Sequence, residues 1–167
     1  ASGPRSATPR TDATTAEARS RYRALGAGLA EFPEARPALE AAQAAGDPII
    51  LGAPNVVRGG SHKRGLSARE CLAQGACDAL VSDYHYPAPR LAALALEASG
   101  HAAAWDLVSA RPAALLGLTD RGVLAPGKRA DLTVIDPLGR VAGTMTRGRR
   151  AYLTGDLRDA WPGTAPG

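Results

Sequence analysis

Side chains suited to binding an anion follow a short apolar run near the middle of the chain. The run over residues 49–51 ends at Gly52, and donors for an oxyanion come soon after it: Asn55, Arg58, Ser61, His62 and Lys63. A guanidinium offers a planar fork of donors that matches phosphate oxygens, and the adjacent glycines 59–60 let a backbone approach a ligand closely. Because ligands bind at the carboxyl ends of parallel strands, the stretch indicates an oxyanion or phosphate pocket. The alternative for the same composition is an exposed polar loop without a ligand.

A second polar group follows the apolar run over residues 78–82, where Asp83 precedes Tyr84, His85 and Tyr86. A carboxylate can bind a cation and can accept a proton from a nearby water, which makes Asp83 a candidate for chemistry. An aspartate that only caps the turn after a strand is the alternative. His85 either contacts a substrate or supports Asp83, or else packs as an ordinary loop residue.

Other titratable residues carry weaker signals. Glu31 ends an apolar segment, where a buried structural carboxylate is as good an interpretation as a site residue. His101 follows Gly100 at a predicted helix start and is expected at the surface. Cys71 and Cys77 lack the spacing of a metal knuckle, so both are expected as buried, reduced thiols.

Strands and helices alternate along the part of the chain that carries these residues. Short strands are predicted over residues 27–32, from residue 48 through the segment IILGAPN, and over 78–82. Helices are predicted over residues 15–25, 34–45, 67–74 and 89–98. The alternation predicts an α/β fold whose parallel strands are joined by helical crossovers over residues 26–100.

Details of these helices give further expectations. In the first helix, Ala18, Tyr22 and Leu25 share one face and are expected to pack together. Ser67 with Glu70 three residues later predicts a capping box. A further helix over residues 102–118 is expected to divide at Pro112.

Outside this region the composition changes. Residues 1–14 have no apolar periodicity and predict a disordered lead-in. From residue 119 to residue 157, turn residues separate short extended segments, which indicates paired strands. Residues 158–167 are expected to form a flexible tail.

Four segments together resemble one enzyme family. They are AEFPEARPALEAAQAAG over residues 30–46, GAPNVVRGGSH over 52–62, LVSDYHYP over 80–87 and DRGVLAPGKRADLTVID over 120–136. In this order they resemble the alpha-D-ribose 1-methylphosphonate 5-triphosphate diphosphatases, which serve the carbon–phosphorus lyase pathway of phosphonate degradation within the amidohydrolase superfamily. The resemblance extends from about residue 15 to about residue 152. The last segment alone identifies only the superfamily.

The resemblance implies a fold and a reaction. Residues 15–118 would be the C-terminal half of a TIM-type (β/α) barrel, and residues 119–157 would be strands of a small β-sandwich. A divalent metal ion such as zinc or manganese would activate water to release pyrophosphate from a ribose methylphosphonate triphosphate. Asp83 would be both a metal ligand and the proton acceptor. Arg58 and His62 would hold phosphate oxygens, with Asn55, Ser61, Lys63 and His85 also contacting the substrate.

The chain also departs from that family. The family's His-x-His pair and its other metal-binding histidines have no counterpart here, and Lys63 and Arg64 stand where small residues and an asparagine are usual. The isolated chain is therefore expected to lack most of the metal ligands and to be inactive by itself. Two alternatives remain: an inactive half-barrel that binds anions or a partner chain, and another amidohydrolase such as a deaminase or deacetylase.

Charge and composition indicate the kind of partner. The net charge of +4 comes from scattered arginines rather than from a basic cluster, which favours a phosphorylated small molecule over a nucleic acid. No apolar run is long enough for a membrane span, and no signal peptide is visible, so a cytoplasmic protein is expected. A homo-oligomer or a separate N-terminal half is a further possible partner.

Overall fold

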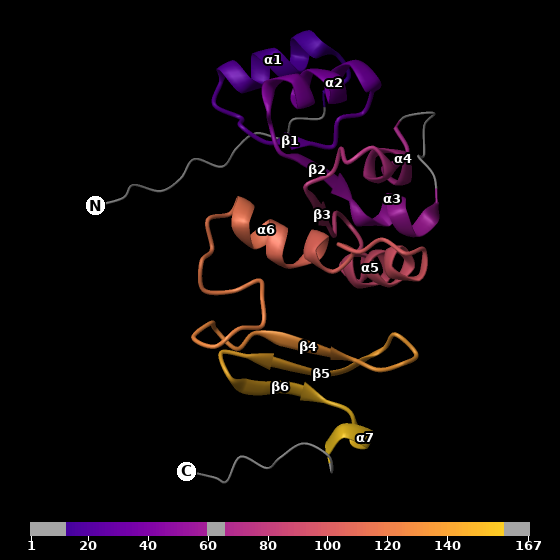
Figure 1. Cartoon of the computed structure of the whole chain (residues 1–167), viewed down its shortest axis with the longest axis vertical. Helices are drawn as coiled ribbons and strands as arrows, with labels where there is room; N and C mark the ends of the chain where they lie inside the picture. Colours follow the sequence, from indigo (N-terminus) through magenta and orange to yellow (C-terminus); the bar gives the residue numbers. More distant parts are fainter. Residues whose placement is uncertain (1–12, 60–65, 159–167) are drawn as a thin grey trace, which may run out of the picture.

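The computed structural model describes residues 13–59 and 66–158 as a mixed α/β chain with two sheets (Figure 1). The first sheet contains three parallel strands in the order β1-β2-β3. Their bounds are Ala30–Glu31 for β1, Ile49–Gly52 for β2 and Ala79–Val81 for β3. Each strand is followed by a helix, so the predicted parallel strand–helix units over residues 26–100 are confirmed.

The described helices that accompany this sheet include α1 (Ala16–Ala24), α2 (Arg36–Ala45), α3 (Ala53–Arg58), α4 (Ala68–Ala73) and α5 (Ala88–Ala98). Helix α1 packs along α2, and α3 packs along α5. Helix α2 has Pro37 in its first turn and ends at Gly46 with φ 69°. A first-turn proline and a left-handed glycine are normal helix boundaries, and both were predicted.

The core of this region is built largely from small side chains. Alanines of α2, α3, α4 and α5 are buried together with larger residues, of which Leu39, Val56 and Leu107 are almost fully enclosed. Alanine has a small side chain, so neighbouring helices and strands can pack with their backbones close together. Much of this core therefore consists of closely packed backbone rather than large side chains. The candidate site residues are therefore attached to a closely packed framework.

Three local expectations were wrong. The segment after β2 was predicted to be a loop, but residues 53–58 form α3, because Pro54 is compatible with a first helical turn and Gly59 ends the helix at φ 75°. Ser67 begins α4 without a side-chain capping bond, so the predicted capping box does not form. Leu25 is 69% exposed, and the buried residue of α1 is Arg19.

The helix expected over residues 102–118 is broken at a different residue. A 3-10 turn, η1, spans Asp106–Val108, and α6 spans Ala110–Leu115. The break is at Ser109, whose φ and ψ are −133° and −79°, and Pro112 lies inside the first turn of α6. Proline is tolerated there because the first N–H groups of a helix have no partner within the helix.

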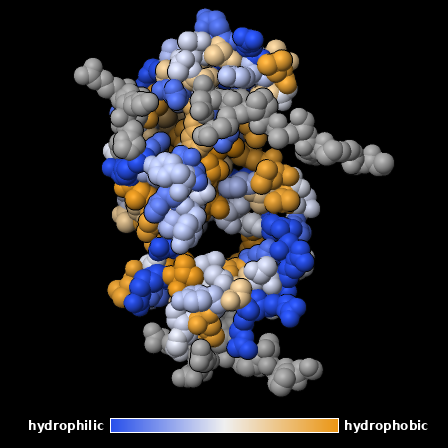
Figure 2. All heavy atoms as spheres, turned by 180° about the vertical axis from the view of Figure 1, so that it is seen from behind, coloured by the Kyte–Doolittle hydropathy of each residue, from blue (hydrophilic) through white to orange (hydrophobic). Residues whose placement is uncertain are grey.

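The second sheet is antiparallel, as expected for paired strands, and contains β4 (Leu132–Ile135), β5 (Val141–Thr146) and β6 (Arg149–Leu153). The short helix α7, Gly155–Arg158, follows β6. Arg90 of α5 donates a hydrogen bond to the Gly139 carbonyl in the β4–β5 turn. Seen from behind, an opening separates part of the helical region from β4–β6 (Figure 2). None of the helices in the described ranges combines the length and apolar character needed to cross a bilayer.

Candidate anion-binding site at the carboxyl edge of the parallel sheet

The parallel strand directions bring the predicted site segments to one edge of the first sheet. Glu31 pairs with Ile50, and Gly52 pairs with Val81, so the strands end close together. Asn55 and Asp83 follow β2 and β3 at that edge. The prediction that Glu31, Asn55 and Asp83 share one sheet edge is therefore confirmed: the backbone at all three residues lies at or just beyond the carboxyl ends of the strands.

An unusual backbone conformation occurs shortly after two of the strands. Phe32 follows β1 with φ 49°, and Asp83 comes soon after β3 with φ 51°. Few residues other than glycine adopt this left-handed region, and strained residues of this kind cluster at functional sites. The Phe32 ring also covers the end of β2, since a Cβ placed on Gly52 would lie 3.0 Å from Phe32 Cε1. The carboxyl edge of the sheet therefore carries two residues with left-handed backbone, and one of them, Phe32, packs its ring against the end of β2.

Arg58 lies between partners from two different elements. Its Nη2 donates to Asn55 Oδ1 at 3.1 Å within α3, and its guanidinium carbon lies 5.7 Å from the centroid of the Tyr84 ring in the loop after β3. Asn55 is half-buried, whereas Arg58 and Tyr84 are exposed. The structure therefore brings together two predicted site residues and adds Tyr84, which the sequence placed next to the site without a role.

The turn after β3 presents Asp83 and His85 to solvent. The His85 N–H donates to the Ser82 carbonyl at 3.0 Å, and the Ala88 N–H donates to the His85 carbonyl at 2.8 Å. These bonds fix the backbone of the turn, while the side chains of Asp83 and His85 are exposed. Both side chains are therefore accessible to a ligand approaching the carboxyl edge.

Several predicted residues are placed differently or lie outside the described ranges. Ser61, His62 and Lys63 belong to the second group, so their proposed contacts remain predictions. Glu31 is half-buried. His101 was expected at the surface but is half-buried, and its Nδ1 is enclosed without a hydrogen-bond partner among the described residues.

A metal centre needs several ligands at one place. Within residues 13–59 and 66–158, no group of three histidine, cysteine, aspartate or glutamate side chains is close enough to hold a metal ion. A metal site in a protein uses three or four such ligands. The described residues by themselves therefore do not fit the metal that the family resemblance implies, and Asp83 as a metal ligand stays a prediction.

The cysteine thiols are not available for nucleophilic chemistry. Cys71 and Cys77 are free and buried, as expected from the sequence. Burial raises the pKa of the Cys77 thiol to about 12, with the nearby Asp78 carboxylate contributing in the same direction. Burial also raises the pKa of Cys71. Both thiols stay protonated near neutral pH, so neither supplies a thiolate.

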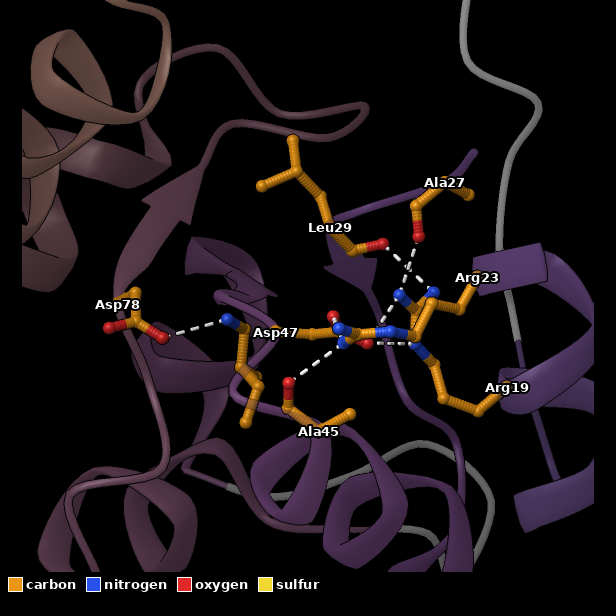
Figure 3. A network of polar contacts seen from close by, with 8 residues as sticks. Arg19, Arg23, Ala27, Leu29, Ala45, Asp47 and Asp78 are labelled. Carbon is orange, nitrogen blue, oxygen red and sulfur yellow. Dashed lines mark hydrogen bonds and ion pairs between the residues drawn. The ribbon is translucent and has the colours of Figure 1, made fainter. Parts of the chain in front are cut away.

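An ion-pair network that the sequence did not predict lies at the opposite edge of the same sheet (Figure 3). Arg19 donates through Nε and Nη2 to Asp47 Oδ2 at 2.9 and 2.6 Å, and it also bonds the carbonyls of Ala27 and Leu29. Arg23 pairs with Asp47 Oδ1 and donates to the Ala45 carbonyl at 2.8 Å. Because Asp47 precedes β2, this network lies at the amino edge, where a structural role is expected.

The sequence contains a signal for this network in hindsight. Arg19 and Arg23 are four residues apart on α1, which places both side chains on one helix face. Asp47 is the one charged residue between the end of α2 and the start of β2. The spacing could suggest a basic face, but only the packing of α1 on α2 identifies the carboxylate that it meets.

A groove of about 670 Å³ lies on the second sheet, away from these residues. Its lining is mainly apolar and includes Val134, Pro137 and Leu138. None of the predicted site residues within the described ranges lines it. We therefore place the candidate site where Asn55, Arg58 and Tyr84 meet, and not in this groove, although the groove is large.

Comparison with known proteins agrees with the sequence motifs. The chain is 43% identical over 129 residues to the alpha-D-ribose 1-methylphosphonate 5-triphosphate diphosphatase of Escherichia coli (strain K12). It is a relative of that diphosphatase. The similarity covers 74% of this chain and 34% of the Escherichia coli diphosphatase, so the chain spans about a third of the length of that relative. The resemblance inferred from the four segments is confirmed, and the partial coverage is consistent with the expected correspondence to one portion of the diphosphatase.

No family model matches the chain, and no solved structure matches it. By its name, the Escherichia coli diphosphatase acts on alpha-D-ribose 1-methylphosphonate 5-triphosphate.

Proposed function

We propose that this chain contributes to a hydrolase that releases pyrophosphate from a ribose triphosphate carrying a methylphosphonate group. The observation that carries the proposal is the 43% identity to the Escherichia coli diphosphatase over three quarters of the chain. The convergence of Asn55, Arg58 and Tyr84 at a sheet edge supports it, because an arginine held at the carboxyl end of parallel strands suits a polyphosphate.

The residues have distinct roles in this proposal. The Arg58 guanidinium binds phosphate oxygens of the substrate, and Asn55 orients the guanidinium through Oδ1. A water oxygen forms a new bond to phosphorus while the bond from that phosphorus to the leaving pyrophosphate oxygen breaks. Asp83 accepts the proton of the attacking water, and His85 contacts the substrate or supports Asp83. No step is assigned to a metal ion, because the described residues do not fit one.

The wider architecture is part of the same proposal. Residues 15–118 would form part of a TIM-type barrel, and residues 119–157 would be strands of a β-sandwich. Three adjacent parallel strands joined by helices support the first assignment, and the antiparallel β4-β5-β6 sheet supports the second. The partner is a phosphorylated small molecule, with a homo-oligomer or a separate N-terminal half completing the site in the cytoplasm.

The anion site can be tested with inorganic tripolyphosphate, titrated into the chain by calorimetry. We expect a millimolar dissociation constant, which corresponds to about −4 kcal/mol. Arg58→Ala should weaken binding about tenfold or more, since a charge-assisted contact contributes about 1.5–3 kcal/mol. Arg58→Lys should fall between the two, because lysine lacks the planar fork.

Arg150→Ala is the matched control. Arg150 is an exposed arginine on β6, in the other sheet, so its loss lowers the net charge equally without touching the site. Equal binding by the wild type and Arg58→Ala would refute the site. Equal weakening by Arg150→Ala and Arg58→Ala would show that only net charge matters.

Hydrolysis requires a separate measurement. The chain is incubated with alpha-D-ribose 1-methylphosphonate 5-triphosphate, with and without manganese, and pyrophosphate is followed by phosphorus NMR. Release that disappears in Asp83→Asn would support the full proposal. Binding without release, even when the missing N-terminal half is supplied, would favour the second candidate, an inactive chain that binds anions.

A further inference from the structure

We propose that Tyr84 is a positioning residue that holds the Arg58 guanidinium in the orientation that a polyphosphate requires. This inference rests on the proposed function, because it assigns a task to a residue that contacts the arginine of that site. Tyr84 acts through Arg58 and need not touch the substrate.

The first support is the position of the ring. Arg58 closes α3, and Tyr84 belongs to the turn after β3, so the contact joins two separate segments of the sheet edge. The guanidinium carbon lies 5.7 Å from the ring centroid, within the range of a cation–π interaction. Asn55 bonds one nitrogen of the same guanidinium at 3.1 Å. These two contacts come from different segments of the chain, and both restrict the rotation of the Arg58 side chain.

The second support is the backbone that carries Tyr84. Asp83 has φ 51°, and the His85 N–H closes the turn onto the Ser82 carbonyl at 3.0 Å. This turn leaves the Tyr84 side chain 68% exposed, although a large aromatic ring is usually more buried. A strained backbone that keeps an aromatic ring at the surface beside an arginine is consistent with a site-directed role for the ring.

The chemistry of the contact is compatible with anion binding. A cation–π contact requires only that the guanidinium lies over the face of the ring, whereas phosphate oxygens bind the N–H groups of the guanidinium. The two interactions therefore do not compete for the same atoms. By restricting the rotamers of Arg58 in advance, Tyr84 lowers the entropy that is lost when the anion binds.

The neighbouring Tyr86 provides a control within the same turn. It is 89% exposed, and no arginine of the described chain is stacked on its ring. A general effect of removing an exposed tyrosine from this turn would appear at Tyr86 as well as at Tyr84. An effect confined to Tyr84 would identify the contact with Arg58.

The test compares tripolyphosphate dissociation constants of Tyr84→Phe, Tyr84→Leu and Tyr86→Leu, with thermal unfolding to confirm the fold. We expect Tyr84→Phe to bind like the wild type, because the ring face is retained. Tyr84→Leu should weaken binding about three- to fivefold, in line with an exposed cation–π contact. Tyr86→Leu should leave binding unchanged.

A double-mutant cycle separates positioning from a direct contact with the anion. If Tyr84 acts through Arg58, then Tyr84→Leu should have no further effect in the Arg58→Ala background. Equal weakening in both backgrounds, or wild-type binding by Tyr84→Leu, would overturn the inference. If Arg58→Ala itself binds normally, the proposed function of this site fails, and the inference fails with it. Weak binding by Arg58→Ala with normal binding by Tyr84→Leu would defeat the inference alone.

Discussion

Asp83 combines a chemical and a conformational role in one residue. Its exposed carboxylate lies at the carboxyl edge of the parallel sheet, and its backbone has φ 51°. Aspartate, asparagine and glycine adopt this conformation more readily than other residues, because their side chains create fewer clashes or offer local hydrogen bonds. The turn accepts aspartate, asparagine or glycine at this position, whereas the proposed proton transfer needs the carboxylate of aspartate.

Substitutions at Asp83 should separate the two roles. Asp83→Ala should lower the free energy of unfolding by about 1 kcal/mol, because alanine is strained at positive φ. Asp83→Gly and Asp83→Asn should change it by less than about 0.5 kcal/mol, yet both remove the carboxylate. Urea unfolding followed by circular dichroism measures the stabilities.

The same variants test the chemistry at Asp83. In an assembly that supplies the missing part of the site and is active with the wild-type chain, both Asp83→Gly and Asp83→Asn should abolish hydrolysis while leaving the fold intact. Equal stability of the alanine and glycine variants would show that the left-handed backbone exerts no strain in solution. Hydrolysis by Asp83→Asn would show that another group accepts the proton.

At the scale of elements, α1 is attached to the sheet by charge rather than by an apolar face. Its buried residue is Arg19, which is 1% exposed, and Asp47, the partner carboxylate, is 6% exposed. Arg19 also bonds two backbone carbonyls before β1, so the guanidinium joins three segments. These hydrogen bonds are directional, so the network fixes the position of α1 more precisely than hydrophobic contacts alone would.

Removing the central carboxylate should therefore be costly. Asp47→Ala should lower the free energy of unfolding by about 3–5 kcal/mol, because it leaves the buried Arg19 charge unpaired. Arg23→Ala should lower it by less than about 1 kcal/mol, since the Arg23 side chain is 49% exposed. Guanidinium chloride unfolding gives both values.

Hydrogen exchange locates the effect within the chain. Amides of α1 should exchange faster in Asp47→Ala than in the wild type, because the helix loses its attachment to the sheet. Amides of β4–β6 should be unchanged and act as the internal reference. A loss below about 1 kcal/mol in Asp47→Ala, or unchanged exchange in α1, would contradict a structural role for the network.

At the scale of the whole molecule, the Cys77 thiol links ionisation to global unfolding. Cys77 is 4% exposed and belongs to the core cluster of the parallel sheet and its helices. Burial raises its pKa to about 12 in the folded chain, whereas an unfolded cysteine has a pKa of about 8.5. The folded state therefore holds the thiol proton more tightly than the unfolded state does.

The sign of the pH dependence follows from proton binding. Between about pH 8.5 and pH 12 the folded chain binds more protons at Cys77, so the free energy of unfolding falls as pH rises. The stabilisation is fully present below about pH 8.5. Wild-type stability should fall more steeply from pH 8 to pH 10 than that of Cys77→Ala, in urea unfolding at matched ionic strength. Parallel curves would show that Cys77 is not buried in solution.

Much of the fold could be predicted because the relevant information is local. Apolar runs that end at Gly52 and Asp83 identified β2 and β3, and first-turn proline with terminal glycine identified α2. Alternation of strands and helices then required a parallel sheet, which placed the candidate residues at one edge. The same local reasoning missed α3, because Asn55 and Arg58 suit either a polar loop or one helical face.

The sequence alone determined the family resemblance, the strand–helix order and the candidates Arg58 and Asp83. Tertiary structure decided which distant side chains meet: Arg58 after β2 meets Tyr84 after β3, and Arg19 meets Asp47 at the opposite edge of the sheet. Local backbone preferences act over a few residues, so a sequence pattern can specify them. A contact between separate segments depends on how helices and strands pack in three dimensions, and no single stretch of sequence contains that geometry.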